Sequence, residues 1–92
     1  MLLADWRGIK VRIWNFDHNR PHVCVKQEEH KARIVIRTGD YIDGFLPPKV
    51  YRRIRKWLER CQEEILIRWD VASVGERFTI IGEDCEDEGV ES

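Results

Sequence analysis

The residues best able to do chemistry in this 92-residue chain gather in one stretch from Asn15 to Val25, which reads N-F-D-H-N-R-P-H-V-C-V. Imidazole titrates near neutral pH and a cation can hold a transferring phosphate, so Asp17, His18 and His22 with a nearby Lys or Arg are candidates for base, acid and charge stabilisation in cleaving RNA. Asp17 before His18 is equally typical of a turn in which the aspartate bonds the loop backbone. We therefore favour a non-catalytic interpretation, with a histidine-dependent ribonuclease-like enzyme as the alternative.

The same stretch also has the residue types of a zinc site. Four residues are candidate ligands for a tetrahedral zinc ion: His18, His22, Cys24 and, from a later helix, Cys61. The spacing His-x3-His-x-Cys is not that of a standard zinc motif, and single cysteines are usually buried as small apolar residues. If Val23 and Val25 face the helix, His22 and Cys24 face away from it, because side chains alternate along a strand. We expect no cofactor, and a small zinc-binding domain is a further alternative.

Strands must position this stretch. Ile9, Val11 and Ile13 alternate with other residues before it, and Val23 and Val25 do so after it, which is the period-2 pattern of half-buried strands. We predict strands over 8–14, 22–26 and 32–37 and a short extended segment over 41–45, with polar turns between them. This order predicts a small antiparallel β-meander.

One long helix is predicted after the meander. Leu46-Pro47-Pro48 is a favourable start, because proline is tolerated in the first turn of a helix. Apolar residues then recur every three or four positions as far as Trp69, so the helix should pack across one face of the sheet and end near Asp70. The fold class is therefore α+β, with 77–81 as a further strand candidate for the sheet edge. The apolar stripe consists of Val50, Ile54, Trp57, Leu58, Cys61, Ile65 and Trp69.

The net charge of −1 hides an asymmetry along the chain. All 16 Lys and Arg lie at or before Arg77, whereas six of the 17 acidic residues follow Ile81, so residues 1–82 carry about +5 by this count. The end of the chain has too few apolar side chains to order itself. We predict a single domain over 1–82 and a disordered acidic tail over 83–92.

Composition indicates the compartment. An apolar content of 42% without a long apolar run predicts a globular domain with no membrane span. The first residues are too polar for a signal peptide, so we expect a cytoplasmic protein. Three cysteines without a C-x-x-C spacing are then expected to be reduced thiols.

Basic residues crowd the first half of the predicted helix. Cations near a helix N-terminus oppose its macrodipole, so local stability does not explain them, whereas a polyanion partner would. Lys10, Arg12, Arg33 and Arg37 on the strands are expected to extend the patch, with Trp14 and Tyr51 as stacking surfaces. A solvated helix face is the alternative. The candidate nucleic-acid-binding residues are Lys49, Arg52, Arg53, Lys56 and Arg60.

The segment D-H-N-x-P-H-x-x-V from Asp17 to Val25, with the later Leu46-Pro47-Pro48 and a helix with two tryptophans, resembles a family of small bacterial domains of unknown function numbered 4160. The resemblance covers about residues 8–70. The family usually has histidine where this chain has Cys24 and Cys61. The resemblance implies a small bacterial protein of a toxin–antitoxin-like pair and supplies no catalytic residue. We predict a non-catalytic interaction module that binds a small partner protein or RNA or DNA.

Overall fold

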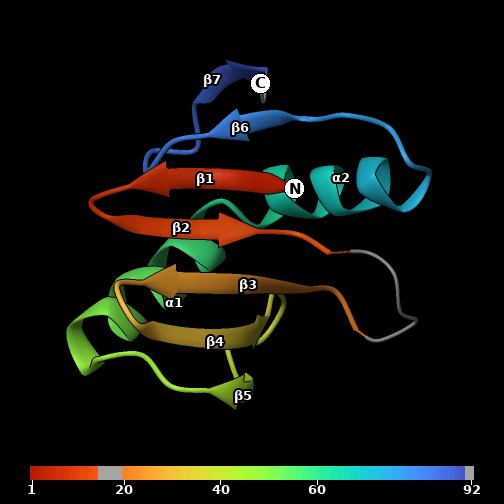
Figure 1. Ribbon diagram of the computed structural model, residues 1–92. Coiled ribbons are helices and arrows are strands. Elements are labelled where there is room, and N and C mark those ends of the chain that lie inside the picture. The colour runs from red at the N-terminus through yellow and green to blue at the C-terminus, as the bar shows by residue number, and fades with distance from the viewer. Residues whose placement is uncertain (15–19, 91–92) are drawn as a thin grey trace.

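The computed structural model describes residues 1–14 and 20–90 and has an α+β fold (Figure 1). Five strands form an antiparallel sheet in which each strand pairs with the next one along the chain. The predicted meander is therefore confirmed, with one strand more than the sequence indicated. The strands are β1 (Leu2–Trp6), β2 (Ile9–Arg12), β3 (His22–Gln27), β4 (His30–Val35) and β5 (Tyr41–Gly44).

The additional strand is β1, whose apolar residues do not alternate. The β1–β2 pairing is irregular between Leu2 and Ala4, and Leu3 and Ala4 are both buried, so a period-2 pattern cannot reveal this strand. Arg7 and Gly8 form the connecting turn with φ angles of 55° and 74°. Positive φ at both central residues is what a two-residue hairpin of the favoured twist requires.

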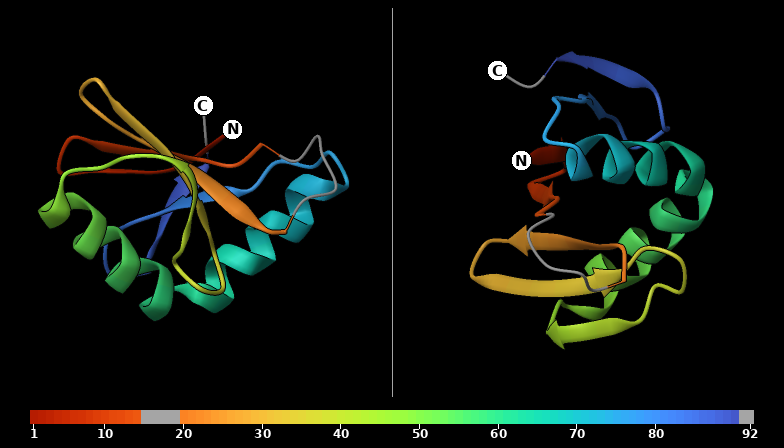
Figure 2. Two further views of the ribbon diagram at one scale, coloured as in Figure 1. Left: turned by 90° about the horizontal axis from the view of Figure 1, so that it is seen from below. Right: turned by 90° about the vertical axis from the view of Figure 1, so that its right-hand side faces the viewer.

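Two helices, α1 (Pro48–Arg60) and α2 (Gln62–Ser73), cover one face of the sheet and meet in a V (Figure 2). The predicted single helix is wrong, because Cys61 leaves the helical conformation with φ −104° and ψ 21°. A straight helix over 48–73 would measure about 39 Å, whereas the longest extent of the molecule is 32 Å. The bend keeps both halves of the apolar stripe over the sheet.

The core lies between the helices and the covered face of the sheet. Val11, Val23 and Ile34 from the strands and Ile54 and Ile65 from the helices are fully buried, so Val23 faces the helix stripe. Polar residues alternate with these strand positions and point to the other side of the sheet, which no helix covers (Figure 2). Within the described ranges, neither helix is long and apolar enough to span a membrane.

The end of the chain folds into a hairpin beside β1. Its strands are β6 (Thr79–Ile81) and β7 (Asp87–Val90), which form a separate two-stranded sheet. The predicted strand over 77–81 therefore exists but pairs with β7 and not with the meander. The predicted disorder over 83–92 is wrong as far as residue 90, and residues 91–92 lie outside the described part.

Three contacts explain why this acidic segment is ordered. Cys85 forms a disulfide with Cys61, so the expectation of reduced thiols is wrong for these two cysteines. The Glu83 carboxylate pairs with Arg7 at 2.7 Å, and the Glu83 carbonyl accepts a hydrogen bond from Arg60 at 2.7 Å. Covalent closure and neighbouring cations offset the self-repulsion that composition alone would predict.

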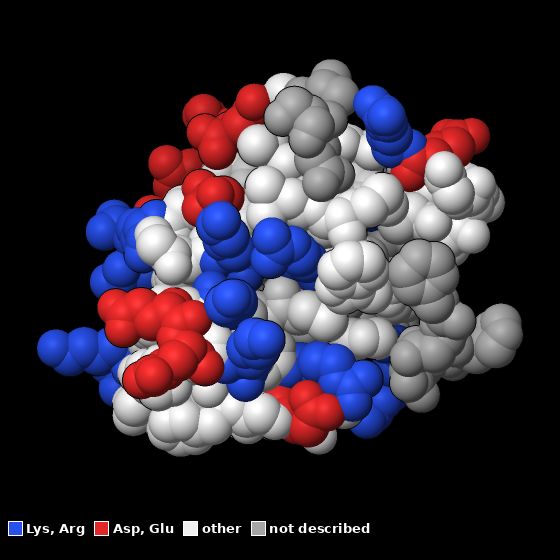
Figure 3. Space-filling model, in the orientation of Figure 1, with Lys and Arg blue, Asp and Glu red and all other residues white. Residues whose placement is uncertain are grey.

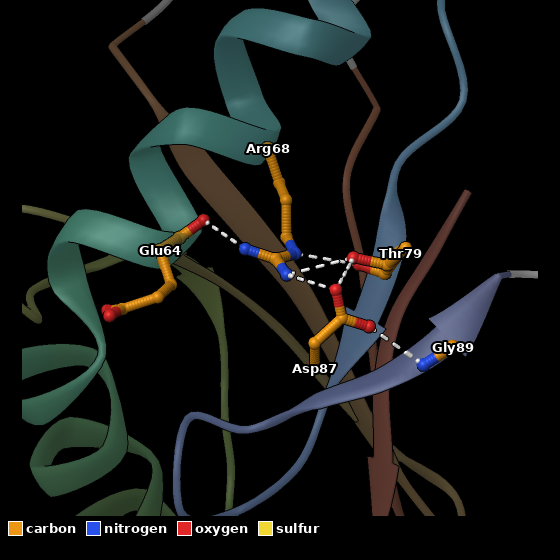
Figure 4. Close-up of polar contacts among 5 residues, drawn as sticks. All are labelled: Glu64, Arg68, Thr79, Asp87 and Gly89. Carbon is orange, nitrogen blue, oxygen red and sulfur yellow. Dashed lines mark hydrogen bonds and ion pairs between the residues drawn. The ribbon is translucent and has the colours of Figure 1, made fainter.

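Hydrogen bonds from Arg68 of α2 fix the position of the β6–β7 hairpin (Figure 4). The Arg68 guanidinium donates to the carbonyl and the hydroxyl oxygen of Thr79 at 2.7 and 3.0 Å and to the carbonyl of Glu64 at 2.9 Å. The Thr79 hydroxyl donates in turn to Asp87 at 2.9 Å, and the other carboxylate oxygen of Asp87 accepts the Gly89 N–H. This network joins α2, β6 and β7.

Candidate nucleic-acid interface

The histidine loop is described only at its end. Asp17 and His18 lie outside the described residues. His22 is 2% exposed, its ring centroid lies 5.4 Å from that of Trp69, and its Nδ1 lies 3.0 Å from the Arg20 carbonyl oxygen. Nδ1 must therefore carry a proton to donate this hydrogen bond. His22 thus packs against α2 at the start of β3, so the expectation that it faces away from the helices is wrong for His22.

The candidate zinc ligands are not brought together. Cys61 is buried beneath the sheet and bonded to Cys85. Cys24 lies on the other side of the sheet, beside Arg12 and Lys26. Over residues 1–14 and 20–90, no three His, Cys, Asp or Glu side chains are grouped as a metal site would need. Cys24 and Cys61 thus cannot serve one metal ion in this arrangement.

The candidate cations of α1 do share one surface. The apolar stripe turns toward the sheet, and residues three and four apart lie together on a helix, so the basic positions fall on the outer side. They border a shallow groove of about 390 Å³ in which Glu83 is the acidic neighbour. We call this surface the basic helix face, and it consists of Lys49, Arg52, Arg53, Lys56 and Arg60.

A cleft of about 670 Å³ adjoins the basic helix face, between α1 and the turn that joins β4 to β5. Arg37 from the turn and Arg55 from α1 line it together with Arg52 and Lys56. Arg55 is missing from the set of five candidates predicted from the sequence, whereas Arg37 was expected to extend the patch. The turn residues after Arg37 indicate where this strand ends, and the structure places that end beside α1.

Aromatic contacts fix the wall of the cleft. The Tyr51 hydroxyl donates to the Gly39 carbonyl at 2.6 Å, and the Tyr51 ring stacks on Tyr41 with centroids 4.2 Å apart. The Arg55 guanidinium lies 5.6 Å from the centre of the Tyr51 ring, within the range of a cation–π interaction. At the other end of the cleft, the Gln62 amide donates to the Ile36 carbonyl at 3.1 Å. The turn and α1 are thus held at a fixed separation.

Cations outnumber acidic side chains on this surface, where Glu59 lines the cleft and Glu83 lines the groove. In the described part of the chain, the ion pairs join Arg7 to Glu83, Arg33 to Asp43 and Arg68 to Asp87. None of them involves the cations of α1, although Arg60 is engaged by the Glu83 carbonyl. Like charges three and four residues apart destabilise a helix, so α1 carries these cations at some cost to stability.

Three of the four strand cations, Lys10, Arg12 and Arg33, do not extend this patch as predicted. Arg12 and Arg33 line the opposite, uncovered side of the sheet, where Trp14 also lies, and Lys10 is paired there with Lys26. Arg37 and Tyr51 do join the cleft beside α1. The described part of the chain therefore has a basic surface on each side, because the sheet separates the outer side of the helices from its own uncovered face.

A meander sheet backed by two helices, with a basic surface on each side, defines a small α+β domain. The chain belongs to the family described as Domain of unknown function (DUF4160), which matches residues 8–70. The match includes β2 to β5, α1 and most of α2, and it leaves out β1 and the β6–β7 hairpin. No curated protein and no solved structure matches the chain.

Proposed function

We propose that this domain is a non-catalytic nucleic-acid-binding module of the bacterial cytoplasm, and that the basic helix face with its adjoining cleft makes the contact. The observation that supports the proposal is the convergence of Arg52, Arg55 and Lys56 from α1 with Arg37 from the β4–β5 turn around one cleft. Crowding of like charges lowers the stability of the helix, whereas phosphates would neutralise these cations.

The type of contact follows from the residue types. Arginine and lysine on an exposed helix bind phosphate oxygens, which fixes position on a nucleic acid without reading its sequence. Binding of this kind releases condensed counterions, so its affinity falls steeply with salt. We therefore expect little sequence preference and a strong dependence on ionic strength.

A charge-reversal series tests the proposal. Wild-type protein should be retained on immobilised heparin at low salt, and Arg52→Glu/Arg53→Glu/Lys56→Glu should flow through with an unchanged circular dichroism spectrum, because these side chains are exposed. The matched single variants are Arg53→Glu and Arg77→Glu, which change the net charge equally. Arg77 is exposed and lies outside the basic helix face and the cleft, so its reversal should affect retention far less.

Two outcomes would count against nucleic-acid binding by the basic helix face. Wild-type protein that fails to bind at low salt would contradict the proposal, and so would equal loss of retention in Arg53→Glu and Arg77→Glu, because total charge and not the surface would then matter. A small protein encoded beside this one, as in a toxin–antitoxin-like pair, would become the better partner candidate. Co-purification of the two proteins would test that alternative.

A further inference from the structure

We propose that the uncovered side of the sheet is a second, separate binding site, and that its ligand is single-stranded nucleic acid. We call this surface the open sheet face. It faces the viewer in Figure 1, with the helices behind it, and Figure 3 shows a band of Lys and Arg side chains through its middle. This proposal does not depend on the basic helix face, which lies on the far side of the domain.

The first observation is a row of three lysines on adjacent strands. Lys10 on β2 lies directly opposite Lys26 on β3, and Lys26 lies directly opposite Lys31 on β4. All three are exposed, and Asp5 on β1 stands opposite Lys10 at the end of the row. Like charges directly opposite each other destabilise a sheet, so the row lowers the stability of the fold. An anionic ligand would neutralise this repulsion.

A second row lies two residues further along the strands, which is roughly 7 Å away. Arg12 is paired with Cys24, and Cys24 with Arg33. The Arg33 Nε donates to both carboxylate oxygens of Asp43 on β5, at 3.1 and 3.0 Å. This hydrogen bonding lowers the pKa of the Asp43 carboxyl and fixes the Arg33 guanidinium on the sheet. The two rows thus place five cations across three neighbouring strands, and Asp43 is already paired with one of them, Arg33.

The third observation is the shape of this surface and its aromatic end. A shallow concavity of about 660 Å³ is lined by Trp14, by one acidic residue, Asp43, and by four cations, Arg12, Lys26, Lys31 and Arg33. Trp14 is 47% exposed, whereas the other three tryptophans are at most 9% exposed. A cationic groove with an exposed aromatic ring is the arrangement by which proteins bind single strands, with phosphates on the cations and a base stacked on the ring.

The aromatic ring selects the ligand class. A duplex keeps its bases stacked inside, so it can meet the lysine rows but offers Trp14 no base. An acidic peptide segment would neutralise the cations without a planar group for the ring. A single strand supplies phosphates and an unpaired base together, so it matches both features of the open sheet face.

Tryptophan fluorescence separates these ligands, because Trp14 is the exposed fluorophore among buried ones. A short oligothymidylate should quench the emission of the wild-type protein on binding, and Trp14→Phe should abolish this signal. Duplex DNA of the same length and poly-glutamate should leave the emission nearly unchanged. Quenching by poly-glutamate equal to that by the oligonucleotide would overturn the proposal in favour of an acidic protein partner.

A pair of triple variants locates the site. Lys10→Gln/Lys26→Gln/Lys31→Gln should weaken oligothymidylate binding at least tenfold while changing duplex affinity by less than threefold. Arg52→Glu/Arg53→Glu/Lys56→Glu should do the reverse. Oligothymidylate binding that survives the lysine substitutions, or that only the α1 substitutions abolish, would overturn this proposal and leave the role of the basic helix face intact. The glutamine variant should fold, because it removes only exposed, mutually repelling charges.

Discussion

Cys61, at the corner between α1 and α2, is joined by a disulfide to Cys85, 24 residues further along the chain, with their Cα atoms 5.3 Å apart. The segment before Cys85 makes two more contacts with α1. The Trp57 indole donates to the Gly82 carbonyl at 3.0 Å, and Arg60 donates to the Glu83 carbonyl. One covalent bond and two hydrogen bonds thus fix the acidic segment beneath the helix corner.

Opening this disulfide should loosen the hairpin. Closing a loop of this length is worth about 3 kcal/mol through the entropy of the unfolded chain, so Cys85→Ser or a reductant should lower the free energy of unfolding by about that amount. Urea unfolding with and without reductant measures it. Cys24→Ser is the control, because it leaves the disulfide intact. Identical unfolding midpoints with and without reductant would contradict the presence of a stabilising Cys61–Cys85 disulfide.

The sequence predicts the meander and the buried stripe because a single physical pattern determines each of them. Val23, Val25, Ile54 and Ile65 repeat at the period of their element, and all four are buried. The C-terminal hairpin could not be predicted in this way. Composition makes residues 83–90 look disordered, and their order depends on Cys85 meeting a partner that is distant in sequence.

Of the candidate surfaces, the basic helix face can be predicted from the sequence, whereas the composition of the cleft and of the open sheet face cannot. The stripe on α1 determines which side of the helix its cations occupy, so the basic helix face follows from helical periodicity alone. That Arg37 joins α1, and that Arg12 and Arg33 lie on the opposite side of the sheet, depends on which face the helices cover. Local sequence patterns do not contain that information.

Acid should weaken the hairpin through Asp87. Hydrogen bonds from the Gly89 N–H and the Thr79 hydroxyl, with the charge of Arg68, lower the pKa of the Asp87 carboxyl. A lowered folded-state pKa gives stability that is present above the unfolded value of about 3.9 and is lost as pH falls through the folded value. Asp87→Asn should therefore be less stable than wild type at neutral pH, with the difference vanishing in acid. An NMR titration of Asp87 that gives an ordinary pKa would contradict the account.

The charge of Lys26 should lower the stability of the fold. Lys26 lies between Lys10 and Lys31 in the sheet, so Lys26→Gln should raise the free energy of unfolding by about 0.5 kcal/mol at low salt. The gain should shrink at high salt, where the repulsion is screened. Thermal unfolding at two salt concentrations measures it, with Arg77→Gln as the control for removal of one positive charge. A loss of stability in Lys26→Gln would show that the lysine row is not repulsive.

The salt dependence of duplex affinity is the most direct test of whether the basic helix face binds nucleic acid. Each phosphate contact contributes about 0.9 to the slope of log affinity against log salt concentration. Arg52→Glu/Arg53→Glu/Lys56→Glu should therefore reduce that slope by about 3 relative to wild type and weaken binding at every concentration. Equal slopes for the two proteins, or no wild-type binding at low salt, would contradict the account.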